Sequence, residues 1–276
     1  MWDKPSQLVT TYHASSFSLF TKDAIEGELI SSERSSRKVV KRGTGEYEDF
    51  YKTETFEEAC DLALYGWKEG RESLLQVKKG IELQSKEQAI RIYDDICGVI
   101  PNVAAYLSGN PLSMINLKCP HEIPTLNIGY CGGVHCGIDA DTVIARGAAI
   151  TSLIDELENN GVSCQLTYLD ISKYNGQEMK VSFVLKRFGE FFDVDEVAFA
   201  LGHPSTQRRF IFSLNEQTPF KNEAEEITQD NYGAAWDWNP EDEDYDIVIP
   251  RIKRNGDDPN CWLEELTQQF TNQKLL

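Results

Sequence analysis

Cysteine and histidine side chains, which can bind zinc or act as nucleophiles, gather in one stretch of the sequence. Cys119 and His121 precede a predicted strand, and Cys131, His135 and Cys136 follow it. Zinc takes four thiolate or imidazole ligands in a tetrahedral array. Cys119, His121, Cys131 and Cys136 therefore form one candidate metal site, although the paired C-x2-C spacing is absent. The alternative is that Cys131, at the end of a strand, is a small buried hydrophobic residue.

Two further chemical roles are open in the same loop. Cys136 with His135 as its base would be a nucleophile, but adjacent residues of an extended chain point apart, and working pairs usually come from distant positions. Asp139 and Asp141 could bind a cation, but Asp139 also stands where the next helix begins, and its carboxylate is expected to accept N–H groups of the first turn. The loop from Cys131 to Asp141 is thus a candidate ligand site of open chemistry.

A second set of chemically capable residues lies further along the chain. His203 precedes Pro204 at a predicted helix start, and Arg208 and Arg209 follow within that helix. The N–H groups of a helix start and arginine side chains both bind anions. We therefore expect either an anion site formed by His203, Arg208 and Arg209, or arginines paired with the chain's many carboxylates and a histidine that packs or caps.

A strand–helix–strand unit positions the first of these sites. Leu126–Tyr130 is a short apolar strand, an apolar stripe at helical spacing extends from Asp139 to a stop at Gly161, and Leu166–Ile171 is rich in strand-forming residues. This order normally gives a parallel crossover. Ligands of open α/β sheets bind at the carboxyl ends of the strands, which here is the loop 131–141.

Further predicted elements extend this unit into a sheet. The pattern predicts strands at Met179–Arg187, Phe210–Leu214 and Asp246–Ile252, and helices at Asp193–Leu201 and Asp258–Phe270. The expected fold class is therefore α/β. It is a doubly wound, Rossmann-like mixed sheet with an N-terminal helical and irregular extension.

Composition divides the chain into three expected parts. Residues 1–55 are polar and are expected to form an arm or extended segment. Residues 56–118 are expected to form a helical N-terminal subdomain, and residues 119–276 the α/β sheet domain.

Charge and hydropathy restrict the partners. The net charge of −18 disfavours general nucleic-acid binding, because phosphate contacts need basic surface. A basic cluster between Arg34 and Arg42 leaves local binding open, and the acidic run Trp236–Asp246 is either a solvated loop, a cation site or a mimic of nucleic-acid charge. No apolar run reaches about 18 residues, so no membrane partner is expected. Seven cysteines, an odd number, favour reduced thiols in a cytosol.

Two resemblances add to these observations. The order of elements in the C-terminal half resembles a von Willebrand A-type domain, but the D-x-S-x-S metal motif of such domains is replaced by residues 127–133, NIGYCGG. Four ordered motifs resemble an uncharacterised family of bacteriophage proteins. They are FEEACDLALYGWKEG (56–70), SGNPLSM (108–114), RGAAITSLIDELENNG (146–161) and HPSTQRRFIF (203–212). This resemblance implies a phage-encoded origin and transfers no catalytic residue.

The expected function is that of a non-enzymatic interaction protein. It would bind a phage or host protein, in the virion or the host cytoplasm, without a cofactor. One alternative is a metal-dependent enzyme or binder that uses the loops at 119–141 with His203 and Arg208, with zinc or another divalent metal. The other is a nucleic-acid-handling protein that uses the basic cluster at 34–42.

Overall fold

The structure is a computed structural model of the 276-residue chain. It describes residues 9–29, 36–37, 50–70, 72, 91–98, 100–118, 124–174, 177–191, 193–217, 234–238 and 245–256. The predicted closing helix at 258–270 lies outside these residues.

The predicted strand–helix–strand unit is the centre of the fold. β5 (Thr125–Cys131) is followed by α6 (Ala140–Asn159) and β6 (Ser163–Tyr174). β5 and β6 pair in parallel, from Thr125 opposite Ser163 to Cys131 opposite Leu169. The helix ends before Gly161, which has a positive φ of 82° that suits glycine. The sequence-based prediction of this unit is confirmed.

A mixed main sheet forms around this unit. Its order is β1-β7-β6-β5-β9, and β8 pairs with β6 off this path. The added strands are β1 (Val9–Ala14), β7 (Gln177–Lys186), β8 (Ala234–Ala235) and β9 (Ile247–Ile249). β6 and β7 pair antiparallel as predicted, whereas β1–β7 and β5–β9 are parallel. The protein is therefore an α/β protein with a mixed sheet.

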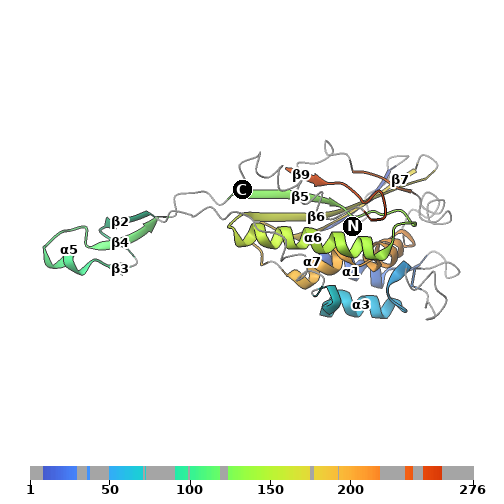
Figure 1. Ribbon diagram of the computed structural model, residues 1–276, viewed down its shortest axis with the longest axis horizontal. Coiled ribbons are helices and arrows are strands. Elements are labelled where there is room, and N and C mark those ends of the chain that lie inside the picture. Colours follow the sequence, from blue (N-terminus) through green and yellow to red (C-terminus); the bar gives the residue numbers. More distant parts are fainter. Residues whose placement is uncertain are drawn as a thin grey trace.

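Helices pack on one side of the main sheet in Figure 1, and the core lies between them and the sheet. They are α1 (Phe17–Glu26), α3 (Phe56–Tyr65), α6 and α7 (Val194–Gly202). Aromatic rings connect the two layers. Phe20 of α1 stacks on Phe183 of β7 at 3.9 Å, and Phe183 stacks on Tyr168 of β6 at 4.6 Å. Burial of these large rings helps to hold the two layers together.

The predicted polar arm at 1–55 needs correction, because part of it belongs to the main sheet. β1 pairs with β7 from Val9 opposite Glu178 to Ala14 opposite Phe183. Every second residue of β1 is buried, which gives the strand one apolar face despite its polar neighbours. The helix α3 also packs on α1 and α7, so it joins the main layer rather than a subdomain ending at 118.

A small module is set apart from the main sheet (Figure 1). It comprises β2 (Arg91–Asp95), β3 (Ile100–Pro101), α5 (Val103–Leu107) and β4 (Met114–Lys118). Its three strands form a separate antiparallel sheet in the order β2-β4-β3. We call residues 91–118 the projecting module.

The predicted strand at Phe210–Leu214 is wrong. This segment is helical: a π-helix, η1 (Thr206–Ile211), leads into α8 (Phe212–Asn215). Phe210 and Leu214 stand four residues apart, so both face the core on a helix, and both are buried. Three alternating apolar residues are compatible with both a strand and a helix, and the helix is formed because it buries Phe210 and Leu214 in the core.

Candidate functional site

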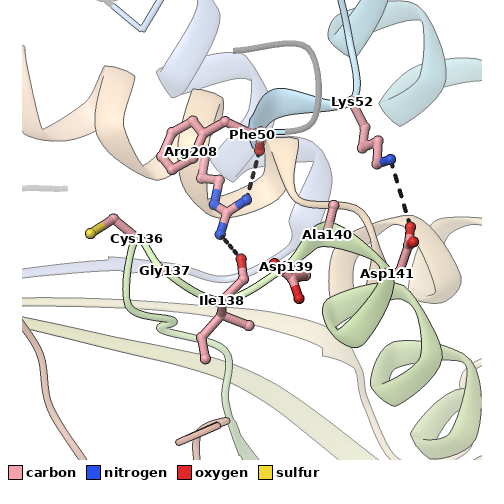
Figure 2. Close-up of a pocket in the computed structure, with 9 residues that line it drawn as sticks. All are labelled: Phe50, Lys52, Cys136, Gly137, Ile138, Asp139, Ala140, Asp141 and Arg208. Atoms are coloured by element: carbon pink, nitrogen blue, oxygen red, sulfur yellow. Dashed lines mark hydrogen bonds and ion pairs between the residues drawn. The ribbon is translucent and has the colours of Figure 1, made fainter. Parts of the chain in front are cut away.

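The loop Cys131–Asp141 lines a pocket at the carboxyl end of β5, the place predicted from the sequence. The pocket has a volume of about 300 Å³. Figure 2 shows the lining residues, which come from three separate segments. They are Phe50, Lys52, Cys136, Gly137, Ile138, Asp139, Ala140, Asp141 and Arg208.

Arg208 forms the wall of this pocket and joins two loops. Its Nη1 donates to the carbonyl of Phe50 and its Nη2 to the carbonyl of Ile138, both at 2.7 Å. The guanidinium also lies over the Phe50 ring, 4.2 Å from its centroid. Burial lowers the pKa of Arg208 to about 10, so the side chain stays charged at neutral pH. Figure 2 shows the guanidinium between the two loops that it holds together.

The residues on either side of Arg208 bind the same two loops, and Arg209 also binds a third segment at Ser36. Gln207 accepts from the N–H of Val134 at 3.2 Å and donates to its carbonyl at 3.3 Å. Arg209 donates to the Thr53 hydroxyl at 2.6 Å, to the Thr53 carbonyl at 2.7 Å and to the Ser36 carbonyl at 2.9 Å. Three consecutive side chains of η1 therefore bind three different loops. Single-turn π-helices occur often at functional sites.

The predicted grouping of His203, Arg208 and Arg209 in one anion site is not what the structure shows. His203 is buried between Trp67 and Phe199, with ring centroids at 4.9 and 4.8 Å, and its Nδ1 accepts from the N–H of Ser205. Burial, and then the charge of Arg209, lower the pKa of His203 to about 3, which keeps it neutral. His203 thus packs in the core, and the arginines bind backbone carbonyls and, for Arg209, the Thr53 hydroxyl as well. Of these three residues, only Arg208 lines the pocket.

Charged side chains complete the rim of the pocket. Lys52 lies 3.6 Å from a carboxylate oxygen of Asp141, whose side chain is largely exposed (Figure 2). Asp139 occupies the predicted N-cap position of α6, but its carboxylate makes no capping hydrogen bond. The hydrogen bond that Asp139 does make comes from its backbone N–H, which donates to the side-chain oxygen of Asn255 at 2.7 Å. The expected cap at Asp139 is therefore correct in position and wrong in bonding.

Cys136 and His135 lie in contact, contrary to the argument from extended geometry. The N–H of Ile138 donates to the carbonyl of His135, so the chain forms a tight turn with Cys136 and Gly137 at its centre. The turn brings the Cys136 sulfur to 3.6 Å from His135 Nδ1, and the N–H of Gly137 donates to the same nitrogen. In Figure 2 the sulfur stands at the outer edge of the pocket. The pair is exposed and forms a local contact rather than an enclosed catalytic pair.

The predicted zinc ligands are only partly described. Cys119 and His121 lie outside the described residues. Cys131 is buried in a cluster with Leu169, Ile171 and Trp238, and burial raises the pKa of its thiol to about 11. Cys136 is exposed instead. Among the residues that the structure describes, no three His, Cys, Asp or Glu side chains converge in a way that could hold a metal ion.

Asp170 is a buried carboxyl group that the sequence did not single out. It lies on β6 beside the loop, where its Oδ2 is 3.4 Å from the Gln207 amide nitrogen, and Ser172 donates to its Oδ1 at 3.4 Å. Burial raises its pKa to about 7, against which these two hydrogen bonds act. A Cβ on Gly133 would come within 2.8 Å of the Asp170 carboxylate, so glycine is needed for the loop to pass.

The projecting module exposes an apolar surface. Val103, Tyr106 and Leu107 of α5 are 61%, 71% and 79% exposed. Ile96, Ile100 and Leu112 of the same module are exposed as well. No residue of the module for which burial is described is buried. An exposed apolar surface of this kind is typical of an interaction site.

The charged segments noted in the sequence are described in part. Of the basic cluster at 34–42, Arg37 donates to the carbonyls of Ala24 and Gly27 and to the Ser213 hydroxyl, so it binds the protein's own core. In the acidic run at 236–246, Asp237 lies 3.5 Å from Arg251 and 3.2 Å from Lys253. The remaining basic residues of the first cluster lie outside the described residues.

Several of these residues were missed by sequence reasoning. Phe50, Lys52, Gln207 and Asp170 carry no motif, and only the fold brings them to the loop. The Gln-Arg-Arg run in the 203–212 motif was an available signal, but the sequence left open whether its arginines bind an anion or pair with carboxylates. The apolar residues at 96–112 are not among the candidates named from the sequence, although the absence of charge from 96 to 117 could have indicated an interaction surface.

Comparison with known proteins places the chain in a family. Residues 6–276 match the family described as Domain of unknown function (DUF7192). The chain belongs to this family. Neither a curated protein nor a solved structure matches it. The von Willebrand A likeness and the phage origin therefore stay predictions. Of the described helices, none is long and apolar enough to cross a membrane.

Proposed function

We propose that this DUF7192 protein is a non-enzymatic interaction protein that binds a protein partner through its projecting module. The single observation that supports this is the exposed apolar side of α5, formed by Val103, Tyr106 and Leu107. An exposed apolar surface of this kind promotes aggregation unless a partner covers it. The expected partner has an apolar cleft that accepts the Tyr106 side chain, since buried tyrosines often carry much of the binding energy of an interface.

The phage resemblance of the four motifs supports a phage-encoded role, in the virion or in the host cytoplasm. The net charge of −18 favours a partner with basic surface around its apolar cleft, since such charges speed association. Arg37, a member of the basic cluster named for nucleic-acid handling, is bound to its own core, which weighs against that alternative.

The experiment compares two double variants as baits in an affinity capture from infected-cell lysate. Tyr106→Asp with Leu107→Asp alters the projecting module, and Leu64→Asp with Tyr65→Asp makes the same change on exposed residues of α3. We expect the wild type and the α3 variant to capture the same partner and the module variant to lose it. Equal capture by all three baits, or no capture by the wild type, contradicts the proposal. Mass spectrometry of purified virions separates the structural role from the intracellular one.

A second candidate function, a small-molecule binder or enzyme at the 131–141 loop, is favoured by the pocket that Arg208 lines. Its test is a thermal-shift measurement with zinc, manganese and magnesium, together with metal analysis of the purified protein. A metal content below about a tenth of an equivalent and no shift remove the metal-dependent form of this candidate.

A further inference from the structure

Among the residues that the structure describes, the outer edge of β2 is an open edge of the module's sheet. In the described residues β2 pairs only with β4, and the three-stranded sheet ends at β2. An open edge presents a row of backbone N–H and C=O groups that can pair with another strand. Pairing of an edge strand with a strand of another chain is a common mode of protein association.

The residues of β2 have an order of charge that suits pairing with a copy of itself. The strand reads Arg91, Ile92, Tyr93, Asp94, Asp95, with its basic residue at one end and its acidic residues at the other. Two such strands paired antiparallel with Tyr93 opposite Tyr93 place Arg91 of each copy opposite Asp95 of the other. Directly opposite residues lie on the same face of a sheet at close range, so opposite charges there attract.

Other arrangements lose this match. Parallel pairing in register would place Arg91 opposite Arg91 and Asp95 opposite Asp95, which is repulsive. An antiparallel shift by two residues would place Arg91 opposite Cys97 or opposite Tyr93 and leave the charges unmatched. The charge order therefore selects one direction and one register.

The same arrangement keeps the acidic bodies of the two copies apart. The module has two basic and two acidic residues, so the net charge of −18 resides in the rest of the chain. The chain enters the module at Arg91 and leaves it at Lys118, which are paired at the end of the module nearest the body (Figure 1). Antiparallel pairing puts the second body beyond Asp95, at the opposite end, where repulsion between bodies is smallest.

We propose that two copies of this chain form a dimer by antiparallel pairing of their β2 strands, with Arg91 of each copy opposite Asp95 of the other. The result is a six-stranded sheet across a two-fold axis, the commonest symmetry of homo-oligomers. The pairing adds backbone hydrogen bonds and neighbouring strands to a small three-stranded sheet. It uses the edge of the module and leaves the apolar side of α5 for the partner of the proposed function.

Charge reversal tests the dimer. The wild type is expected to have twice the chain mass of 31.3 kDa in light scattering and sedimentation at tens of micromolar. Arg91→Glu alone places two acidic residues opposite each other at both ends of the paired strands, and Asp95→Arg alone places two basic residues there. Each single variant should therefore be a monomer. The double variant Arg91→Asp with Asp95→Arg restores the match and should restore the dimer. Lys22→Glu, on the exposed face of α1, makes the same charge change as Arg91→Glu and should leave the mass doubled.

A monomeric wild type, a single reversal that stays dimeric, or a double variant that stays monomeric overturns the dimer. Thermal unfolding of each variant, expected to match the wild type, shows that the body is intact. The result is separable from the proposed function. Arg91→Glu should still capture the protein partner, whereas Tyr106→Asp with Leu107→Asp should lose it and remain dimeric.

Discussion

Replacement of Arg208 by methionine tests whether this side chain holds the two loops of the pocket together. The change removes hydrogen bonds to the carbonyls of Phe50 and Ile138 and the contact with the Phe50 ring, while it keeps an apolar chain of similar length. A hydrogen bond to a charged group contributes about 1.5–3 kcal/mol, and removal of a buried charge offsets part of the loss. We therefore expect the free energy of unfolding to fall by about 3 kcal/mol.

Urea unfolding followed by tryptophan fluorescence measures this loss, and hydrogen exchange locates it. The amides from Val134 to Ile138 should exchange faster in Arg208→Met, since one of their anchors is gone. Arg208→Lys should recover only part of the stability, because an ammonium group cannot span two carbonyls as the planar guanidinium does. Lys22→Met, which removes an exposed charge on α1, serves as the control and should change stability by less than about 0.5 kcal/mol. A loss below about 1 kcal/mol for Arg208→Met with unchanged exchange would refute the reasoning.

Three further predictions concern packing, pH and thiol access. Gly147→Ala would put a Cβ 2.2 Å from the Gly202 Cα where α6 meets α7, so we expect a loss of about 1–3 kcal/mol in urea unfolding. Gly202→Ala, whose Cβ would meet its nearest atom, in the Trp67 ring, at 3.4 Å, should cost less, and equal losses would contradict the close contact. Burial raises the pKa of Asp170 from its ordinary 3.8 to about 7, so the neutral carboxyl group stabilises the fold fully below pH 3.8, and this stabilisation is lost as the pH rises to about 7. The free energy of unfolding of Asp170→Asn relative to wild type should therefore rise between about pH 5 and 7.5. A difference that does not depend on pH would refute the shift. In the native protein, iodoacetamide should label the exposed Cys136 well before Cys131 and Cys164, whose pKa values burial raises to about 11 and about 12; peptide mass spectrometry reads the order, and early labelling of either buried thiol would contradict it.

The elements that were predicted correctly are those whose sequence signals lie within the element itself. The crossover from β5 through α6 to β6 has an apolar strand, a helical stripe and a glycine stop, and each of these depends on neighbouring residues only. The same holds for α7, where the Asp193 side chain accepts the N–H groups of Asp195 and Glu196 as a cap. The carboxyl end of β5 could be named as a ligand site because sheet topology follows from that order of elements.

The predictions that failed concern segments whose structure depends on contacts with residues distant in the sequence. The segment 210–214 has too few apolar positions to separate a strand from a helix, and burial against α1 and α3 decided it. β1 has a short apolar face in a polar segment, and its place in the sheet depends on pairing with β7, about 170 residues away.

The sequence by itself determined the α/β class, the central crossover and the position of the loop 131–141, because these follow from periodicity and turn residues within short windows. Only the tertiary structure decided which side chains meet at that loop. Arg208, Gln207 and Asp170 reach it because η1 and β6 pack beside it, and His203 does not because two aromatic rings enclose it. The role of a buried polar group depends on the partners that folding brings to it, and those partners are distant in sequence.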